Sequence, residues 1–175
     1  MVKPSTKTPH TTQEKNLYAS RYLKRETIRH QRSVGVTESL LSRLKEVVTL
    51  IGQNNTTVRS YASAIIREHL CDYRHIHEYI RRCLYRQNTS DDADVYQNPT
   101  EVYFNKYLGK NEEYRNSVSI HVDFECARLL GVIVQWADTG ATIGSFASAI
   151  LEEHLDKYSS LLNEIGSDIY KCQLL

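Results

Sequence analysis

Arginines and short hydrogen-bonding side chains gather between residues 25 and 59. A guanidinium group presents a planar fork of N–H donors that fits the oxygens of a phosphate or a carboxylate. The arginines of this stretch that could bind such oxygens together are Arg25, Arg29, Arg32 and Arg59. Residues 31–36, Gln-Arg-Ser-Val-Gly-Val, alternate polar and apolar types, which is the period of a half-buried strand. The segment is therefore suited to binding anions beside an exposed strand.

Charge is divided unevenly along the chain. Residues 1–88 carry 16 lysines and arginines against 7 acidic residues, whereas residues 89–175 carry 6 against 14. A strongly basic half is the electrostatic footprint of a nucleic-acid-binding surface, because neutralised phosphates release condensed counterions. The alternative is that two halves of opposite sign simply attract each other.

The composition argues against a membrane or secreted protein. No apolar run approaches the ~20 residues that span a bilayer, and the first ten residues lack the apolar core of a secretory signal. The cysteines never form a Cys-x-x-Cys pair, so they are expected to be reduced thiols. A cytoplasmic protein that does not contact membranes is predicted.

Nothing in the sequence is typical of an enzyme. It lacks a Gly-rich phosphate loop and a nucleophile motif with a companion base, so no catalytic residue and no cofactor are predicted. His69, Cys71, His75 and His77 could be imagined around a metal. Zinc ligands usually come as two tight pairs, however, so we expect these side chains to occupy the faces of one long helix, with no metal site.

An internal repeat organises the chain. Residues 57–73 and 142–158 share 10 identities in 17 positions at an offset of 85. The same offset pairs the element Tyr-x-x-x-Tyr-Leu at 18–23 with its copy at 103–108, and Ser33–Val36 pairs with Ser117–Ile120 at an offset of 84. The predicted divisions are a disordered tail at 1–13, a basic repeat at 14–86, an acidic linker at 87–99 and an acidic repeat at 100–175.

Each repeat is predicted to contain a short helix, a strand and two further helices. In the first repeat Thr37 can cap a helix that stops at Gly52, a residue that tolerates left-handed dihedrals. Thr56 or Thr57 can cap the next helix, which is expected to continue to about Arg86. The second repeat places a strand at 115–122, a helix at 124–137 and a last helix opened by Thr142. His69 and His154 recur at equivalent positions, which favours a structural role such as a cap or an inter-helix hydrogen bond.

Strand, capped helix, tight turn and capped helix is the order of the ribbon-helix-helix fold, and residues 33–44 resemble small repressors of that class. The resemblance implies a mainly α protein whose short strands form an antiparallel ribbon that enters the major groove. A lone strand is unstable, so we expect the strand around Val34 to pair with that around Val118 in a single-chain pseudo-dimer. The alternative is pairing between two molecules, which gives a homodimer.

A closer resemblance is to a TraB-like family of unknown function from Bacteroides-type conjugative transposons. It rests on a helix ending in His-Leu-x-x-Tyr, found at 69–73 and again at 154–158. The resemblance implies a gene in a conjugation or mobilisation region. A partition-type ATPase or other conjugation proteins would then be partners.

These observations predict an accessory or regulatory protein of a mobile element that binds double-stranded DNA, with transcription regulation as one role. The first repeat is expected to dominate contact with DNA, through the ribbon's outward face, the start of the helix after Thr57, and flanking arginines. The predicted DNA-binding residues are Arg25, Arg29, Gln31, Arg32, Ser33, Gly35, Thr57, Arg59, Arg115, Ser117, Ser119 and His121. The acidic second half and the small outward side chains favour the alternative of a protein-interaction adaptor that does not bind DNA.

Overall fold

The computed structural model describes residues 9–52, 56–85, 93–109 and 117–173. The first half contains α1 (Thr12–Tyr22), β1 (Gln31–Thr37), α2 (Glu38–Leu50), α3 (Val58–Asp72) and α4 (Arg74–Tyr85). The second half contains α5 (Ala93–Tyr107), β2 (Ser117–Asp123), α6 (Phe124–Ala137), α7 (Ile143–Lys157) and α8 (Ser159–Gln173). The described chain is mainly helical with one small sheet, as predicted. None of these helices combines the length and the apolar content needed to cross a bilayer.

The two strands pair with each other as an antiparallel ribbon. Val34 faces Ile120 at its centre, and the ribbon ends at the pairs Gln31 with Asp123 and Thr37 with Ser117. Helices from both repeats pack against the ribbon. The start of α7 lies against the backbone of β1 at Gly35, and the Ser63 hydroxyl of α3 accepts a hydrogen bond from the N–H of Asp123 at the end of β2, at 2.9 Å.

The structure corrects the alignment of the two strands. The inward positions are Val34 and Val36 in β1 and Ile120 and Val122 in β2, all at most 3% exposed. Equivalent positions therefore differ by 86, not by the predicted 84. The prediction aligned Ser33 with Ser117, whereas the buried residues Val34 and Ile120 set the register. Since side chains alternate with a period of two, the two-residue error left each residue on its predicted face.

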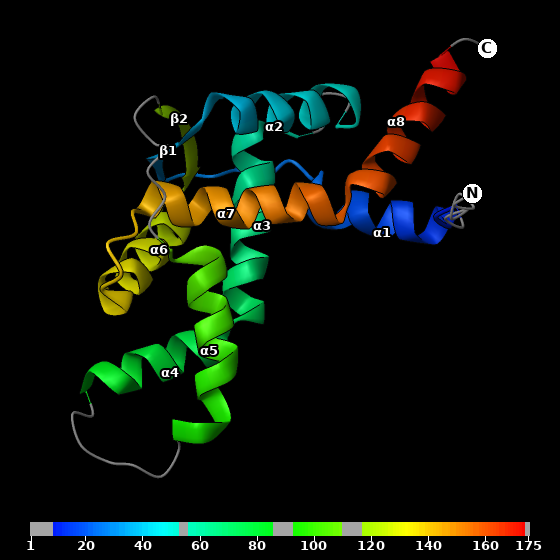
Figure 1. Ribbon diagram of the computed structural model, residues 1–175. Coiled ribbons are helices and arrows are strands. Elements are labelled where there is room, and N and C mark those ends of the chain that lie inside the picture. Colours follow the sequence, from blue (N-terminus) through cyan, green and yellow to red (C-terminus); the bar gives the residue numbers. More distant parts are fainter. Residues whose placement is uncertain (1–8, 53–55, 86–92, 110–116, 174–175) are drawn as a thin grey trace.

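The outer helices join the two halves. α3 and α7 cross at the centre of the molecule, α5 packs beside α4, and α1 lies beside α8 (Figure 1). Lys15 of α1 holds α8 through ion pairs to Glu164 at 3.3 Å and Asp168 at 2.8 Å. Each Tyr-x-x-x-Tyr helix thus contacts both repeats, since α1 also packs on α3 and α5 also packs on α7, and the buried residues form one continuous core rather than two.

Buried tyrosines and histidines join α1 and α5 to the helices that they pack on. The hydroxyl of Tyr18 lies 2.9 Å from Nε2 of His154 and 2.6 Å from the hydroxyl of Tyr61. The hydroxyl of the equivalent Tyr103 lies 3.0 Å from Nε2 of His69 and 2.7 Å from Nε2 of His77. The inter-helix hydrogen bond predicted for the repeated histidines is confirmed.

Burial keeps these imidazoles neutral. Desolvation lowers the pKa of His69 and of His154 to about 3, and that of His77 to about 4. A hydroxyl has one proton, so Tyr103 donates to one of its two histidines and accepts from the other. The two rings must therefore carry their protons on different nitrogens.

The predicted long helix is wrong, because α3 ends at Asp72 and α4 begins at Arg74. At Tyr73 the backbone leaves helical geometry (φ −97°, ψ 16°) while its N–H still bonds the carbonyl of His69 at 3.0 Å. The bend brings His77 of α4 back toward the hydroxyl that His69 of α3 also bonds. An unbroken helix would carry the two rings apart along its axis.

Three local predictions also change. Gly52 ends α2 without a positive φ; instead, an added Cβ there would lie 2.5 Å from the carbonyl oxygen of Val48. Residues 93–99 of the predicted linker belong to α5, whose buried Tyr103 and Tyr107 anchor a helix long enough to include Pro99. Thr12 and Gln13 of the predicted tail are helical, because Thr11 and Glu14 form a capping box.

Candidate nucleic-acid interface

The outward face of the ribbon carries the side chains predicted to face bases. Gln31 and Ser33 of β1 are exposed and Gly35 is half-buried. The outward positions of β2, which are all exposed, are Ser117, Ser119 and His121. Ser33 lies opposite His121, and its hydroxyl is 3.3 Å from the ring Nδ1. The fold thus brings both repeats' predicted residues onto one polar surface.

Helix starts flank this surface. Thr57 caps α3, accepting a hydrogen bond from the N–H of Ser60 at 3.1 Å, and Thr142 caps α7 in the same way with Ser145 at 3.0 Å. Of the two predicted threonines before α3, Thr57 is the cap. The other N–H groups in the first turn of a helix have no partner inside it, which makes the turn attractive to anions.

Arg59 lies in the first turn of α3 and donates through Nη1 to Oε1 of Gln31 at the ribbon's end. The equivalent position on α7 is Gly144, which lies against the backbone of β1. A Cβ at Gly144 would be 2.6 Å from the carbonyl oxygen of Gly35. The ribbon is therefore flanked by a guanidinium at one end and by close backbone packing at the other.

Gly144→Ala is expected to lower the free energy of unfolding by about 1–3 kcal/mol, because α7 must move away from β1 to admit the methyl group. Equilibrium urea unfolding measures the change. Gly166→Ala in α8 is the matched control, since nothing lies within 4 Å of its added Cβ and helix propensity predicts a gain of up to about 1 kcal/mol. Equal stabilisation by both changes would contradict the close contact.

The other predicted arginines lie along the approach to β1. Arg25, Arg29 and Arg32 are exposed. Arg115, predicted on the second strand, lies outside the described residues. The first repeat therefore supplies the guanidinium groups that the structure places around the ribbon.

The sequence prediction missed the contacts that hold the segment before β1. The Ser60 hydroxyl donates to the carbonyl of Glu26 and accepts from its N–H, both at 3.3 Å, and Arg67 pairs with the Glu26 carboxylate at 3.1 Å. Ser60 recurs as Ser145 in the second repeat, and this identity between the repeats was the sequence signal that could have pointed to a structural role for Ser60. These contacts fix the exposed arginines relative to α3.

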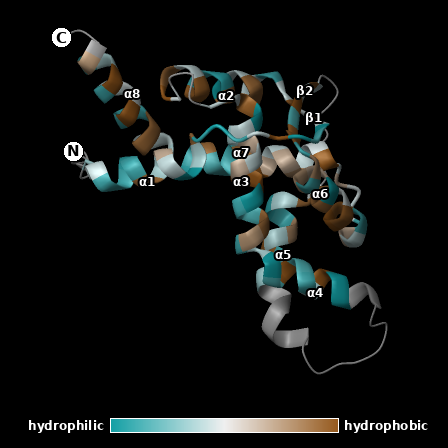
Figure 2. Ribbon diagram, turned by 180° about the vertical axis from the view of Figure 1, so that it is seen from behind, coloured by the Kyte–Doolittle hydropathy of each residue, from teal (hydrophilic) through white to brown (hydrophobic). Residues whose placement is uncertain are grey.

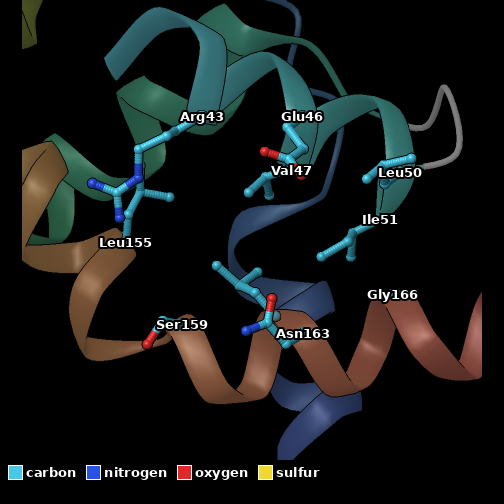
Figure 3. Close-up of a pocket in the computed structure, with 10 residues that line it drawn as sticks. Arg43, Glu46, Val47, Leu50, Ile51, Leu155, Ser159, Asn163 and Gly166 are labelled. Atoms are coloured by element: carbon cyan, nitrogen blue, oxygen red, sulfur yellow. The ribbon is translucent and has the colours of Figure 1, made fainter. Parts of the chain in front are cut away.

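A second surface feature is a groove of about 330 Å³ between α2 and α8 (Figure 3). Its walls include Val47, Leu50 and Ile51 from α2 and Leu162 from α8, and Leu50 is 56% exposed. Hydrophobic positions are visible at the end of α2 and along α8 (Figure 2). At the equivalent place in the molecule, where α6 corresponds to α2 and α4 to α8, α4 packs directly on α6. The groove thus marks a difference between the repeats.

The residues considered for a metal do not converge. His69 and His77 are buried against Tyr103, whereas Cys71 and His75 are exposed. Among the described residues no group of three or more histidine, cysteine or acidic side chains is arranged to hold a metal ion.

Comparison with known proteins finds a similarity in the first half of the chain. Residues 1–82 match the model of a family described as proteins of unknown function, DUF3408. The matched part includes α1, β1, α2 and α3 and ends within α4, so it corresponds to the first repeat. Searches of curated proteins and of solved structures found no match.

Proposed function

We propose that this chain is a DNA-binding accessory or regulatory protein of a conjugative or mobile element, built as a single-chain ribbon-helix-helix pseudo-dimer. The observation that carries the proposal is the exposed polar face of the β1–β2 ribbon, to which both repeats contribute, with capped helix starts on either side. The mobile-element context rests on the resemblance to the TraB-like family and is compatible with the match to a family of unknown function.

The dimensions of duplex DNA support this use of the ribbon. The major groove is about 12 Å wide and admits a two-stranded ribbon, whose outward side chains then meet base edges. The inward valines and isoleucine stay in the core and hold the ribbon rigid. The free amides of the first turns of α3 and α7 would meet the phosphates on either side of the groove.

Charge supports contact through the first repeat. Arg29 and Arg32 are exposed beside the ribbon, and Arg59 reaches its end. Each phosphate that a guanidinium neutralises releases condensed counterions, so affinity should fall as salt rises.

The test is fluorescence anisotropy with the full chain and a labelled random-sequence duplex pool at two salt concentrations. Binding should weaken steeply with salt. The triple variant Arg29→Ala, Arg32→Ala, Arg59→Ala should lose most of the affinity and reduce the slope of log affinity against log salt by about 2–3.

The matched control removes the same charge from α4, which lies at the far end of the molecule from the ribbon (Figure 1). The variant Arg74→Ala, Arg81→Ala, Arg82→Ala should keep most of the affinity. Absent or salt-insensitive binding would contradict the proposal, as would equal losses in the two triple variants.

The groove between α2 and α8 favours a second candidate function, a protein-interaction adaptor for the conjugation machinery such as a partner of a partition-type ATPase. An exposed leucine beside an apolar groove suits a partner's hydrophobic side chain. Leu50→Lys should then abolish co-purification with the purified ATPase while leaving anisotropy with DNA unchanged. An unaltered interaction, or none with the unsubstituted chain, would count against this candidate.

A further inference from the structure

We propose that the ribbon recognises an asymmetric duplex sequence in one orientation, with the base-specific contacts made at a single end by Gln31 and His121. This inference rests on the proposed DNA-binding function and specifies its substrate. It follows from how the two repeats differ at equivalent positions of the same outward face.

The internal two-fold of the ribbon passes through the central pair Val34 and Ile120. Positions that a symmetric dimer would fill with identical side chains are filled differently here. The equivalent outward pairs are Gln31 with Ser117, Ser33 with Ser119, and Gly35 with His121. Only the middle pair keeps the same residue type.

The long polar side chains fall at one end of the ribbon because its strands are antiparallel. Ser33 lies directly opposite His121, and Gln31 is the next outward position of β1 toward that end. Opposite Gln31 is Asp123, whose carboxylate is engaged as the cap of α6, accepting from the N–H of Glu125 at 2.9 Å. Gln31, Ser33 and His121, whose side chains all carry hydrogen-bonding groups, therefore face outward together.

The other end offers little to a base edge. Gly35 lies opposite Ser119 and has no side chain. Thr37 lies opposite Ser117, but its hydroxyl caps α2, accepting from the N–H of Leu40 at 3.3 Å. Short serines do not reach as far as glutamine or histidine and discriminate poorly among bases.

The neighbouring contacts orient the groups at the first end. Arg59 donates to the carboxamide oxygen of Gln31, which leaves the amide nitrogen to donate outward to an acceptor such as N7 of a purine. Nδ1 of His121 is shared with the hydroxyl of Ser33, which leaves Nε2 directed to other partners. A preorganised pair of this kind loses little side-chain entropy on binding.

The two helix starts differ from each other in the same sense as the two ends of the ribbon face. Arg59 brings positive charge to the end that carries Gln31, whereas the equivalent Gly144 packs so closely on Gly35 that no side chain fits. At the second end the available phosphate ligands are backbone amides. A symmetric dimer requires a palindromic site, whereas this surface favours one orientation on a non-palindromic one.

The test is repeated selection of the full chain against a random duplex pool, followed by sequencing. The enriched motif should lack inverted-repeat symmetry and should be informative on one side of its centre. Gln31→Ala and His121→Ala should each reduce the preference for that motif over a scrambled duplex by about tenfold. The matched controls Ser117→Ala and Ser119→Ala should each change it less than threefold.

A palindromic motif, or equal losses from the serine variants, would overturn the inference. Retention of duplexes without any enriched motif would also overturn it, while leaving the proposed DNA-binding function standing. If no duplex were retained even at low salt, the proposed function itself would fail, so the two failures are distinguishable.

Discussion

Tyr103→Phe is expected to lower the free energy of unfolding by about 2–4 kcal/mol, since each buried polar group left without a partner costs about 1–3 kcal/mol. The Tyr103 hydroxyl bonds Nε2 of both His69 and His77, and all three side chains are buried. Removing the oxygen leaves two buried ring nitrogens facing a phenyl edge without the partner that they share.

Urea unfolding at pH 7.5 measures this change. Tyr170→Phe is the matched control, because Tyr170 is 66% exposed and its hydroxyl can keep its bonds to water. That variant should unfold within about 0.5 kcal/mol of the parent. If Tyr103→Phe behaved like the control, the hydroxyl would not be the link between α3, α4 and α5 that the distances indicate.

Acid is expected to unfold the protein well above the range in which carboxylates titrate. In the folded chain the pKa of His69 and His154 is about 3 and that of His77 about 4, against an ordinary value of 6.5. Between pH 6.5 and these lower pKa values the unfolded chain binds more protons than the folded chain. The stability that comes from keeping these histidines neutral is therefore fully present above pH 6.5 and is lost as the pH falls. Each histidine contributes about 1.4 kcal/mol per pH unit, which makes pH 5 strongly destabilising.

Urea midpoints between pH 7.5 and pH 5 test this expectation. His154→Gln should reduce the slope of stability against pH by about 1.4 kcal/mol per unit, because one titrating group is removed. A stability that stays flat across this interval would contradict neutral, buried histidines.

The sequence was informative where the repeat and the amphipathic pattern agreed. The caps at Thr37 and Thr142, the inward positions Val34 and Val36, and the pairing of the two strands within one chain were all predicted and are present. The caps and the inward positions depend on local spacing along the chain. The strand pairing depends on an apolar strand face that a partner strand must help to cover. Such features leave a periodic signal in a single sequence.

The features that were missed depend on contacts that only the folded backbone reveals. Helix propensity does not distinguish a continuous helix from one broken at Tyr73, because the break is set by where His77 meets Tyr103. Gly52 was assigned to a left-handed turn, whereas the carbonyl of Val48 is what excludes a side chain there. A tertiary contact overrides local preference at Tyr73, whereas at Gly52 the deciding contact is only four residues away but depends on the exact path of the backbone.

The candidate interface was predicted by residue type but not by grouping. The outward alternation located Ser33 and His121 on an exposed face, yet their contact depends on a strand register that the sequence alignment placed two residues away. The bond between Arg59 and Gln31 joins residues 28 apart in the chain and has no local signal. Charge counting found the basic half without showing which end of the ribbon it flanks.

The contacts that α1 makes with the second repeat tie folding to translation. Tyr18 leaves the ribosome early, but its partner His154 is 136 residues further along the chain. β1 likewise waits for β2, and a growing chain that contains only the first repeat exposes an unpaired strand edge and an uncovered aromatic helix. Such intermediates are prone to aggregate. Synthesis of α7 must therefore be complete before the first repeat can bury its own tyrosines.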